Sequence, residues 1–270
     1  MRVISLLFHD VHGAEPAESG FASAAADRYK LTQADFDAQL AGVRGVRHDA
    51  PIITTDISSP QIAAGGPVPF LITVDDGGVS YYSRIAAALE QRGWRGHCFV
   101  STDYIGQRGF LSRDQIRALA TRGHVIGSHS ASHPARFSAL PFAVMVSEWS
   151  RSRQVLEDVL GRRVEVGSVP GGYYSTTVAR AAREAGIRVL FTSEPVTRID
   201  ASGDCVRVGR FTIRRGDPHD AAQRLVSTTR WARSLAWVSW NAKGLVKPLL
   251  GPSYIRLADW LLTPPASGRT

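Results

Sequence analysis

Two adjacent carboxylates follow an apolar stretch in the first third of the chain. Residues 71–78 read Leu-Ile-Thr-Val-Asp-Asp-Gly-Gly. Neighbouring residues at the end of a strand point in different directions, so Asp75 and Asp76 can serve two roles, one as a metal ligand and one as a base. The alternative is an ordinary turn, because Asp-Gly is common turn chemistry.

Two histidines four residues apart follow a second apolar stretch. His129 and His133 are separated by Ser-Ala-Ser, and Pro134 comes next. Because proline disfavours helical backbone at the residue before it, we expect a tight loop here rather than a helix. Small residues between the histidines let both imidazoles face one point. The alternative is a pair of exposed loop histidines without a shared role.

Taken together, the two segments predict a metal centre. One Asp and two His provide three protein ligands and leave coordination positions open for water and substrate. A divalent cation in such a site lowers the pKa of bound water and polarises a carbonyl, and the second Asp can accept the proton of the water. Zinc suits these ligands, although cobalt, nickel and iron also tolerate them.

These segments resemble the motifs of the polysaccharide deacetylases of the carbohydrate esterase type, also called the NodB homology group. The first family motif is Thr-Phe-Asp-Asp-Gly, and residues 73–77 match four of its five positions. The second motif is His-Ser/Thr-X-X-His, and residues 129–133 match it fully. The resemblance covers roughly residues 1–215, with both motifs in the expected order.

The resemblance implies a role for each motif residue. Asp75 would be the general base, and the hydroxyl of Ser130 would stabilise its loop. The metal ligands would be Asp76, His129 and His133, with Zn²⁺ as the expected ion.

A third segment departs from the family pattern. The family usually has Arg-X-Pro-Tyr-Gly, whereas residues 168–172 read Ser-Val-Pro-Gly-Gly. Pro170 fits, and the Gly171 N–H can stabilise an oxyanion as the usual Tyr N–H would. Ser168 stands where the Arg that steadies the catalytic Asp is expected. Arg210 could supply that guanidinium from another strand; the alternatives are a solvated charge for Arg210 and a plain β-turn for the segment.

The general acid of the family is usually a histidine in a Leu-X-His strand near the C-terminus, and no such strand follows residue 190. Instead, the apolar residues 6–8 lead into His9. Some members of the family are circularly permuted and begin with such a strand. The resemblance therefore implies a permuted member in which His9 protonates the leaving amine. The alternative is a strand-end histidine paired with Asp10 or with backbone.

Apolar runs of strand length alternate with helical stretches along the chain. This order predicts a mostly parallel sheet or a barrel, with active groups at the carboxyl ends of the strands. The resemblance implies an α/β fold over residues 1–230. This fold is the distorted (β/α) barrel of the polysaccharide deacetylases, with about seven parallel strands. The expected strands lie near residues 3–8, 70–74, 97–100, 124–127, 164–168 and 188–192.

The composition is that of a globular protein with a basic surface. The chain has 270 residues, of which 44% are hydrophobic and 21% charged, so whole-chain disorder, collagen and coiled coil are excluded. Two cysteines cannot form a disulfide framework. The net charge of +8 favours anionic partners. Nucleic acid is not an expected partner, because no reader motif accompanies the charge.

Residues 231–270 differ in character, with four of the six Trp and five basic residues against one acidic residue. We interpret them as a C-terminal helical arm that is not an independent domain. The arm could lie on an anionic membrane surface; the alternative is a pair of helices that cap the barrel. No signal-peptide core or membrane-spanning stretch is visible, so we expect a cytoplasmic protein, which could lie at the inner membrane face.

The combined prediction is a metal-dependent hydrolase that removes N-acetyl groups from an amino sugar. The acetylated glycan would be a polysaccharide or a lipid-linked precursor, as in exopolysaccharide biosynthesis. The alternatives are an O-acetyl esterase or a non-sugar amidase with the same site, and an inactive glycan-binding protein that keeps the fold. Ser168 favours the inactive protein, and the intact Asp and His motifs favour an enzyme.

Overall fold

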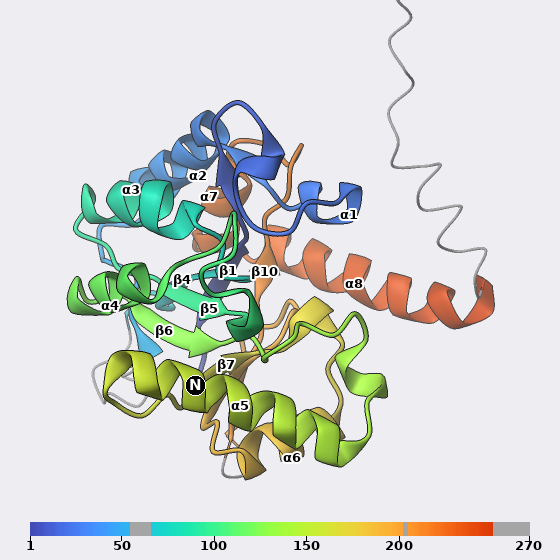
Figure 1. The fold of residues 1–270 in the computed structure, drawn as a ribbon. Helices are drawn as coiled ribbons and strands as arrows, with labels where there is room; N and C mark the ends of the chain where they lie inside the picture. The colour runs from blue at the N-terminus through green and yellow to red at the C-terminus, as the bar shows by residue number, and fades with distance from the viewer. Residues whose placement is uncertain (55–65, 202–204, 251–270) are drawn as a thin grey trace, which may run out of the picture.

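A curled sheet of parallel strands forms the centre of the molecule, with helices around its outside (Figure 1). The computed structural model describes residues 1–54, 66–201 and 205–250, with side chains as far as residue 242. In the described chain the main sheet has eight strands in the order β10-β1-β4-β5-β6-β7-β8-β9. They are β1 (Ile4–Phe8), β4 (Phe70–Val74), β5 (His97–Val100), β6 (Val125–Ser128), β7 (Val166–Ser168), β8 (Val189–Phe191), β9 (Val206–Val208) and β10 (Phe211–Thr212).

The two edge strands of this sheet are consecutive in the chain. Only Gly209 and Arg210 separate β9 from β10, and each strand runs parallel to its neighbour, β8 or β1. The chain therefore keeps its direction over residues 206–212, which act as one bent strand and draw the two edges of the sheet together. The sequence predicted about seven strands, and the structure has eight because this bend divides one of them.

Helices cover the outer face of the sheet, and local sequence signals explain where several of them begin and end. The side chain of Ser112 accepts a hydrogen bond from the Gln115 N–H in a capping box. Ser175 caps a later helix by accepting a hydrogen bond from the Val178 N–H. Gly161 ends the longest helix of the barrel with a left-handed φ of 67°. The helices are α1 (Ala24–Asp27), α2 (Gln33–Val46), α3 (Ala86–Glu90), α4 (Arg113–Thr121), α5 (Phe142–Leu160), α6 (Thr176–Glu184), α7 (Ala221–Val226) and α8 (Trp231–Leu250).

Apolar side chains fill both faces of the sheet. Along β4 they alternate, so that Ile72 and Val74 pack towards the outer helices while Leu71 packs inside the curl with Phe99 and Phe191. Because the strands are parallel, the loops after β4, β6 and β7 all leave the sheet at its carboxyl end. The predicted functional segments occupy these loops.

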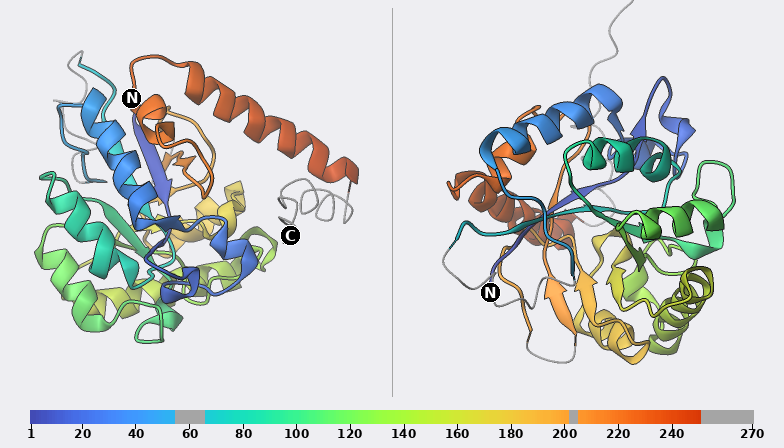
Figure 2. Two further views of the ribbon diagram at one scale, coloured as in Figure 1. Left: turned by 90° about the horizontal axis from the view of Figure 1, so that it is seen from above. Right: turned by 90° about the vertical axis from the view of Figure 1, so that its left-hand side faces the viewer.

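Helix α8 runs along one side of the barrel and extends beyond it (Figure 2). It begins at Trp231, where the C-terminal arm was predicted to begin, and residues 251–270 lie outside the described residues. The domain boundary at residue 230 stays a prediction. A small second sheet pairs β2 (Val11–His12) with β3 (Leu31–Thr32). Among the described helices, none has the length and apolar character needed to cross a membrane.

Candidate active site

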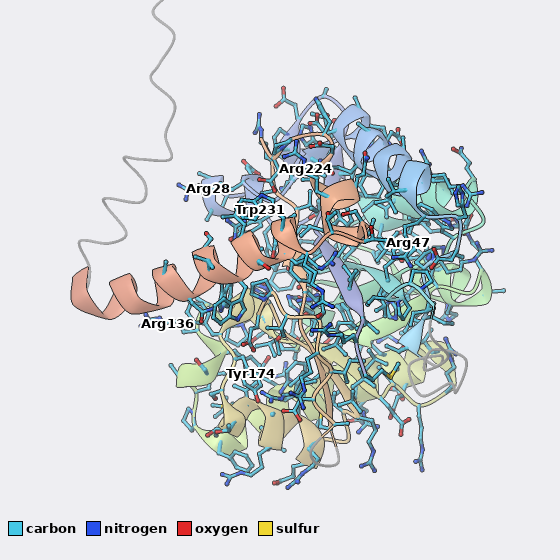
Figure 3. All side chains as sticks on the ribbon, turned by 180° about the vertical axis from the view of Figure 1, so that it is seen from behind. Arg28, Arg47, Arg136, Tyr174, Arg224 and Trp231 are labelled. Carbon is cyan, nitrogen blue, oxygen red and sulfur yellow. The ribbon has the colours of Figure 1, made fainter. Side chains whose placement is uncertain are left out.

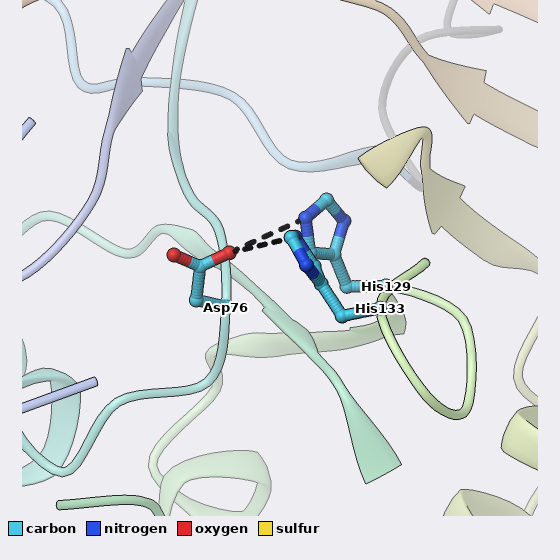
Figure 4. A group of neighbouring side chains, drawn as sticks. All are labelled: Asp76, His129 and His133. Atoms are coloured by element: carbon cyan, nitrogen blue, oxygen red, sulfur yellow. Dashed lines mark ion pairs between the residues drawn. The ribbon is translucent and has the colours of Figure 1, made fainter. Parts of the chain in front are cut away.

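Asp76, His129 and His133 converge at the carboxyl end of the sheet (Figure 4). Asp76 Oδ1 lies 3.4 Å from His129 Nε2 and 3.4 Å from His133 Nε2. This spacing is longer than an ordinary N–H···O hydrogen bond. It is close to the edge, roughly 3.3 Å, of a tetrahedron whose metal–ligand bonds are about 2.0 Å. The three side chains therefore fit a divalent cation and leave one coordination position open.

The backbone of this site is strained at the residues that matter. Asp76, Ser130 and His133 have positive φ values of 77°, 64° and 52°. Such values are uncommon outside glycine and concentrate at functional sites. The conformation at His133 excludes a continuous helix through both histidines, so the predicted tight loop is confirmed. Gly77 follows Asp76 with a φ of 80°, where a Cβ atom would lie 3.0 Å from Val100 Cα.

Neighbouring groups act differently on the two histidines. His129 Nδ1 lies 2.9 Å from the Ser168 carbonyl oxygen and donates its proton there, which leaves Nε2 directed at Asp76. Burial favours the neutral ring, but the charges of Asp75 and Asp76 outweigh it and raise the pKa of His129. Burial and the neighbouring His129 lower the pKa of His133 to about 4. His133 is therefore neutral at pH 7.

Hydroxyl groups hold the histidine loop from inside. Ser130 Oγ accepts a hydrogen bond from the His133 N–H at 3.1 Å, and the Ser130 N–H donates to Ser128 Oγ at 3.2 Å. These contacts supply the kind of support that the resemblance implied for Ser130.

Glu148 holds the same loop from α5 and was not among the residues predicted from sequence. Its carboxylate accepts hydrogen bonds from the N–H groups of Ala131 and Ser132, at 3.1 and 2.8 Å, and from the Ser132 hydroxyl at 3.0 Å. The side chain is buried. The sequence carried one signal for it: an acidic residue between Met145 and Trp149 on the apolar face of the helix.

We expect Glu148→Ala to loosen the histidine loop. The substitution leaves buried N–H groups without an acceptor, which should lower the free energy of unfolding by about 2–4 kcal/mol. Metal affinity should fall about 10- to 100-fold, as for other residues that orient ligands. Chemical denaturation and competition with a chromophoric chelator measure the two effects. Asp158→Ala, at an exposed position of the same helix, is the matched control; equal metal affinity in both variants would contradict the assigned role.

Asp75 lies beside the three ligands but is bound by other groups. Arg210 Nη1 and Nη2 donate to its two carboxylate oxygens at 2.7 and 2.8 Å, and Ser168 Oγ donates at 3.1 Å. Its Oδ2 atom is 3.8 Å from His129 Nε2. Burial alone would raise the pKa of Asp75, but Arg210 and His129 outweigh burial and lower it. Asp75 is therefore an ionised carboxylate.

Arg210 is completely buried, so the alternative of a solvated strand-end charge is wrong. Its Nε donates to the Thr192 carbonyl at 3.0 Å, and its guanidinium lies 5.8 Å from the centre of the Phe99 ring. The bend between β9 and β10 directs the side chain inwards. Ser168 Oγ accepts a hydrogen bond from Arg210 Nη2 at 2.8 Å. The serine thus completes the arrangement in which a distant arginine takes the place of the motif arginine.

The turn Pro170–Gly172 follows β7, the strand that ends at Ser168. Gly171 has a φ of 61°, and a Cβ atom there would lie 3.1 Å from the Tyr173 ring. The Gly172 N–H donates to the Val169 carbonyl at 3.4 Å. Among the described residues the Gly171 N–H has no backbone acceptor, so it could donate to an oxyanion.

His9 lies next to the acidic pair because β1 and β4 are neighbours. The Asp75 N–H donates to the Phe8 carbonyl at 3.2 Å. Burial lowers the pKa of His9, and the charges of Asp76 and Asp75 act in the opposite direction. Its ring is 4.8 Å from the Tyr29 ring, and its buried Nδ1 has no hydrogen-bond partner among the described residues.

A pair between His9 and Asp10, the alternative for this histidine, is not formed. The Asp10 carboxylate instead accepts hydrogen bonds from Ser19 Oγ at 2.5 Å and Ser80 Oγ at 2.8 Å. Cβ atoms at Gly20 and Gly78 would collide with Asp10. Asp10 therefore joins the loop after β2 to the loop that follows the acidic pair.

Comparisons with known proteins agree with this architecture. YxkH of Bacillus subtilis, whose name assigns it to the polysaccharide deacetylases, is 27% identical over 125 residues, which are 46% of this chain and 44% of YxkH. The match thus spans less than half the length of that relative. The match to the deacetylase PplD of Streptococcus pyogenes, solved with acetate, covers 84% of this chain and 99% of PplD. Its TM-score is 0.69 at 17% identity. The match to IcaB from Ammonifex degensii covers 87% of this chain and 96% of IcaB, at a TM-score of 0.65 and 22% identity.

The central part of the chain also matches a family model. Residues 65–190 match the model described as polysaccharide deacetylase. This range contains the acidic pair, the histidine loop and the Pro170–Gly172 turn, and it excludes His9 and Arg210. Residues 65–190 thus resemble the polysaccharide deacetylase family, as the curated relative does, and the chain shares the parallel barrel of the solved deacetylases.

Proposed function

We propose that this protein is a metal-dependent hydrolase that removes N-acetyl groups from an amino sugar in a glycan. One observation supports it above the others: a buried, ionised Asp75, fixed by Arg210, lies beside three side chains with metal-ligand spacing. A base next to an open metal position is what hydrolysis of an acetamide requires. Zinc is the proposed ion, because its tetrahedral sites use His and Asp ligands at this spacing.

Each residue then has a defined task in the reaction. A cation held by Asp76, His129 and His133 would acidify a water molecule and polarise the acetyl carbonyl. Asp75 accepts the proton as the water oxygen attacks the carbonyl carbon. The Gly171 N–H donates to the oxygen that becomes negative. His9 protonates the nitrogen as the C–N bond breaks, so that acetate and a free amine leave.

The arrangement also bears on the competing functions. The inactive glycan-binding protein was suggested by Ser168, and the bidentate contact of Arg210 with Asp75 removes that reason. An O-acetyl esterase remains the second candidate, because it would use the same base, ligands and oxyanion donor. The two differ in the leaving group: an amine needs a proton to leave, and an alkoxide needs less help.

Acetate release from acetylated chitooligosaccharides tests the proposal. We expect release by the purified full chain, loss of release after dialysis against a chelator, and recovery on adding Zn²⁺. The metal content of protein purified without chelator should approach one ion per chain. Protein that binds no divalent ion and releases no acetate would support the inactive glycan-binding protein instead.

The role of His9 predicts a difference between amide and ester substrates. We expect His9→Ala to reduce acetate release from N-acetyl sugars by about 10²- to 10³-fold, the contribution of a general acid. Release from an O-acetylated sugar or an aryl acetate should fall less than tenfold. His48→Ala, at an exposed position, is the control. Equal losses on both substrates would contradict His9 as the acid.

The remaining partner and location expectations stay predictions. They are the polymeric or lipid-linked form of the glycan, contact of residues 231–270 with an anionic membrane, a cytoplasmic location, and the absence of a nucleic-acid partner. Circular permutation also stays a prediction. Supporting it, β1 lies between β10 and β4 and carries His9 to the end of the barrel where the acidic pair lies.

A further inference from the structure

A large pocket lies at the end of the strands opposite to the active site. Its volume is about 1210 Å³. It is bordered by the starts of β1 and β10 at Ile4 and Phe211, by the end of α2, and by the first turns of α8. We call it the basic pocket because its lining includes Arg2, Arg47, Arg198, Arg230 and Arg233.

Most of the positive charge in the basic pocket is uncompensated. Among the described residues that line it, the one carboxylate is that of Asp49, which Arg47 binds through two of its nitrogens. Arg2, Arg198 and Arg230 are exposed and form no ion pair with the described residues. Like charges held close together repel one another, and an anion with several oxygens would relieve that repulsion.

The pocket also has an apolar wall, which a site for a small soluble anion would not need. Arg233, Ser234 and Trp237 follow helical spacing, so one face of α8 presents an arginine and a tryptophan to the pocket. Arg230, directly before the helix, lies beside them in the lining. Figure 3 views the molecule from the side on which α8 lies and labels Trp231 at its start. Trp237 and Val238, which line the pocket, are 49% and 54% exposed. Trp231 and Leu235, on the same turns of α8 but outside the lining, are 77% and 56% exposed. Large apolar side chains beside free arginines are typical of surfaces that meet a lipid interface.

We propose that the basic pocket binds the phosphate head of an anionic lipid at a membrane surface. Guanidinium groups bind phosphate through paired hydrogen bonds, and exposed tryptophans favour the interface between lipid head groups and chains. The head would lie among Arg2, Arg198 and Arg230, and the lipid chain would lie against α8. The site uses residues from the start of β1 and from the segment after β8 as well as from α8.

The same helix also reaches the active site. A Cβ atom at Gly172, in the turn that carries the proposed oxyanion donor, would lie 3.9 Å from Trp240 Cη2. A lipid held against the first turns of α8 would thus place the membrane along a helix that borders the active-site end of the barrel. The lipid site does not depend on the proposed function, because none of its arginines contacts the metal ligands or Asp75.

Vesicle sedimentation with the full chain tests the lipid site. The probes are vesicles of phosphatidylcholine alone and vesicles that also contain about 30% phosphatidylglycerol. The second kind has a negative surface, which attracts basic residues. We expect binding only to the anionic vesicles, weakening as salt rises. Arg198→Gln/Arg230→Gln should reduce the binding constant at least tenfold, since each basic residue contributes roughly fivefold. Arg113→Gln/Arg162→Gln, which removes the same charge from the α4 and α5 side of the barrel, should bind as the unaltered protein does.

Three results would count against the lipid site. Absence of binding to anionic vesicles, or equal losses in both double variants, would overturn the proposal. Displacement by about 1 mM inorganic phosphate, far below what charge screening needs, would show a soluble-anion site and also overturn it.

Acetate release from a soluble substrate should be unchanged in Arg198→Gln/Arg230→Gln. Vesicle binding without any acetate release would refute the proposed function and leave the lipid site standing.

Discussion

Asp75→Asn is expected to reduce acetate release by about 10²- to 10⁴-fold, the contribution of a positioned general base. The amide cannot accept the proton of the attacking water, although it is nearly the size and shape of the carboxylate. Asp76, His129 and His133 remain in place, so metal content should stay close to that of the unaltered protein. A kcat that falls with little change in KM would show that the carboxylate acts in the chemical step.

Two controls make this result interpretable. Ser168→Ala removes one hydroxyl donor to the same carboxylate and one acceptor of Arg210, which keeps both of its contacts with Asp75. It should cost about tenfold in kcat, since a hydrogen bond to a charged group contributes about 1.5 kcal/mol. Asp75→Asn also leaves the buried Arg210 without its anion, so its thermal unfolding must be measured beside its activity. A folded, metal-loaded Asp75→Asn protein with more than a tenth of the normal kcat would rule out Asp75 as the base.

The metal-ligand cluster could be predicted from sequence because each part of it is local. Asp76 is the second residue after β4, and His129 follows directly on β6, so the parallel sheet alone brings both to one end of the barrel. The proline after His133 was enough to predict a loop in place of a helix. Strands of four or five mostly apolar residues, such as β4 and β5, were likewise visible as apolar runs.

The supports of the cluster were harder to predict because they depend on long-range packing. Glu148 reaches the histidine loop from the middle of α5, and only its position on a buried helix face sets it apart from a surface glutamate. Arg210 meets Asp75 across 135 positions of sequence. The short strands β9 and β10 gave no apolar run to mark the bend, so the inward direction of Arg210 could be proposed from sequence but not distinguished from a solvated charge.

Arg210→Met is expected to damage both the fold and the reaction. Removing one partner of a buried ion pair typically lowers the free energy of unfolding by about 3–5 kcal/mol, because the other charge is left without compensation. Without the guanidinium, burial raises the pKa of Asp75 and reduces the fraction that can act as a base. We therefore expect at least a 10²-fold loss of kcat in whatever fraction of the protein folds. Arg210→Lys should be intermediate, because an ammonium group cannot bind both carboxylate oxygens as a fork.

A second substitution tests whether Asp75 needs a guanidinium charge beside it or the bulk of the side chain at position 210. Ser168 lies where the family usually has its arginine, and its Oγ is 2.8 Å from Arg210 Nη2. In Arg210→Met/Ser168→Arg, the new guanidinium starts beside the space that the old one leaves. We expect this double variant to regain at least tenfold in kcat and about 1–3 kcal/mol in unfolding free energy over Arg210→Met, since a charged hydrogen bond to Asp75 returns. Recovery of stability without activity would mean that Arg210 fills space in the core and does not set the charge of the base.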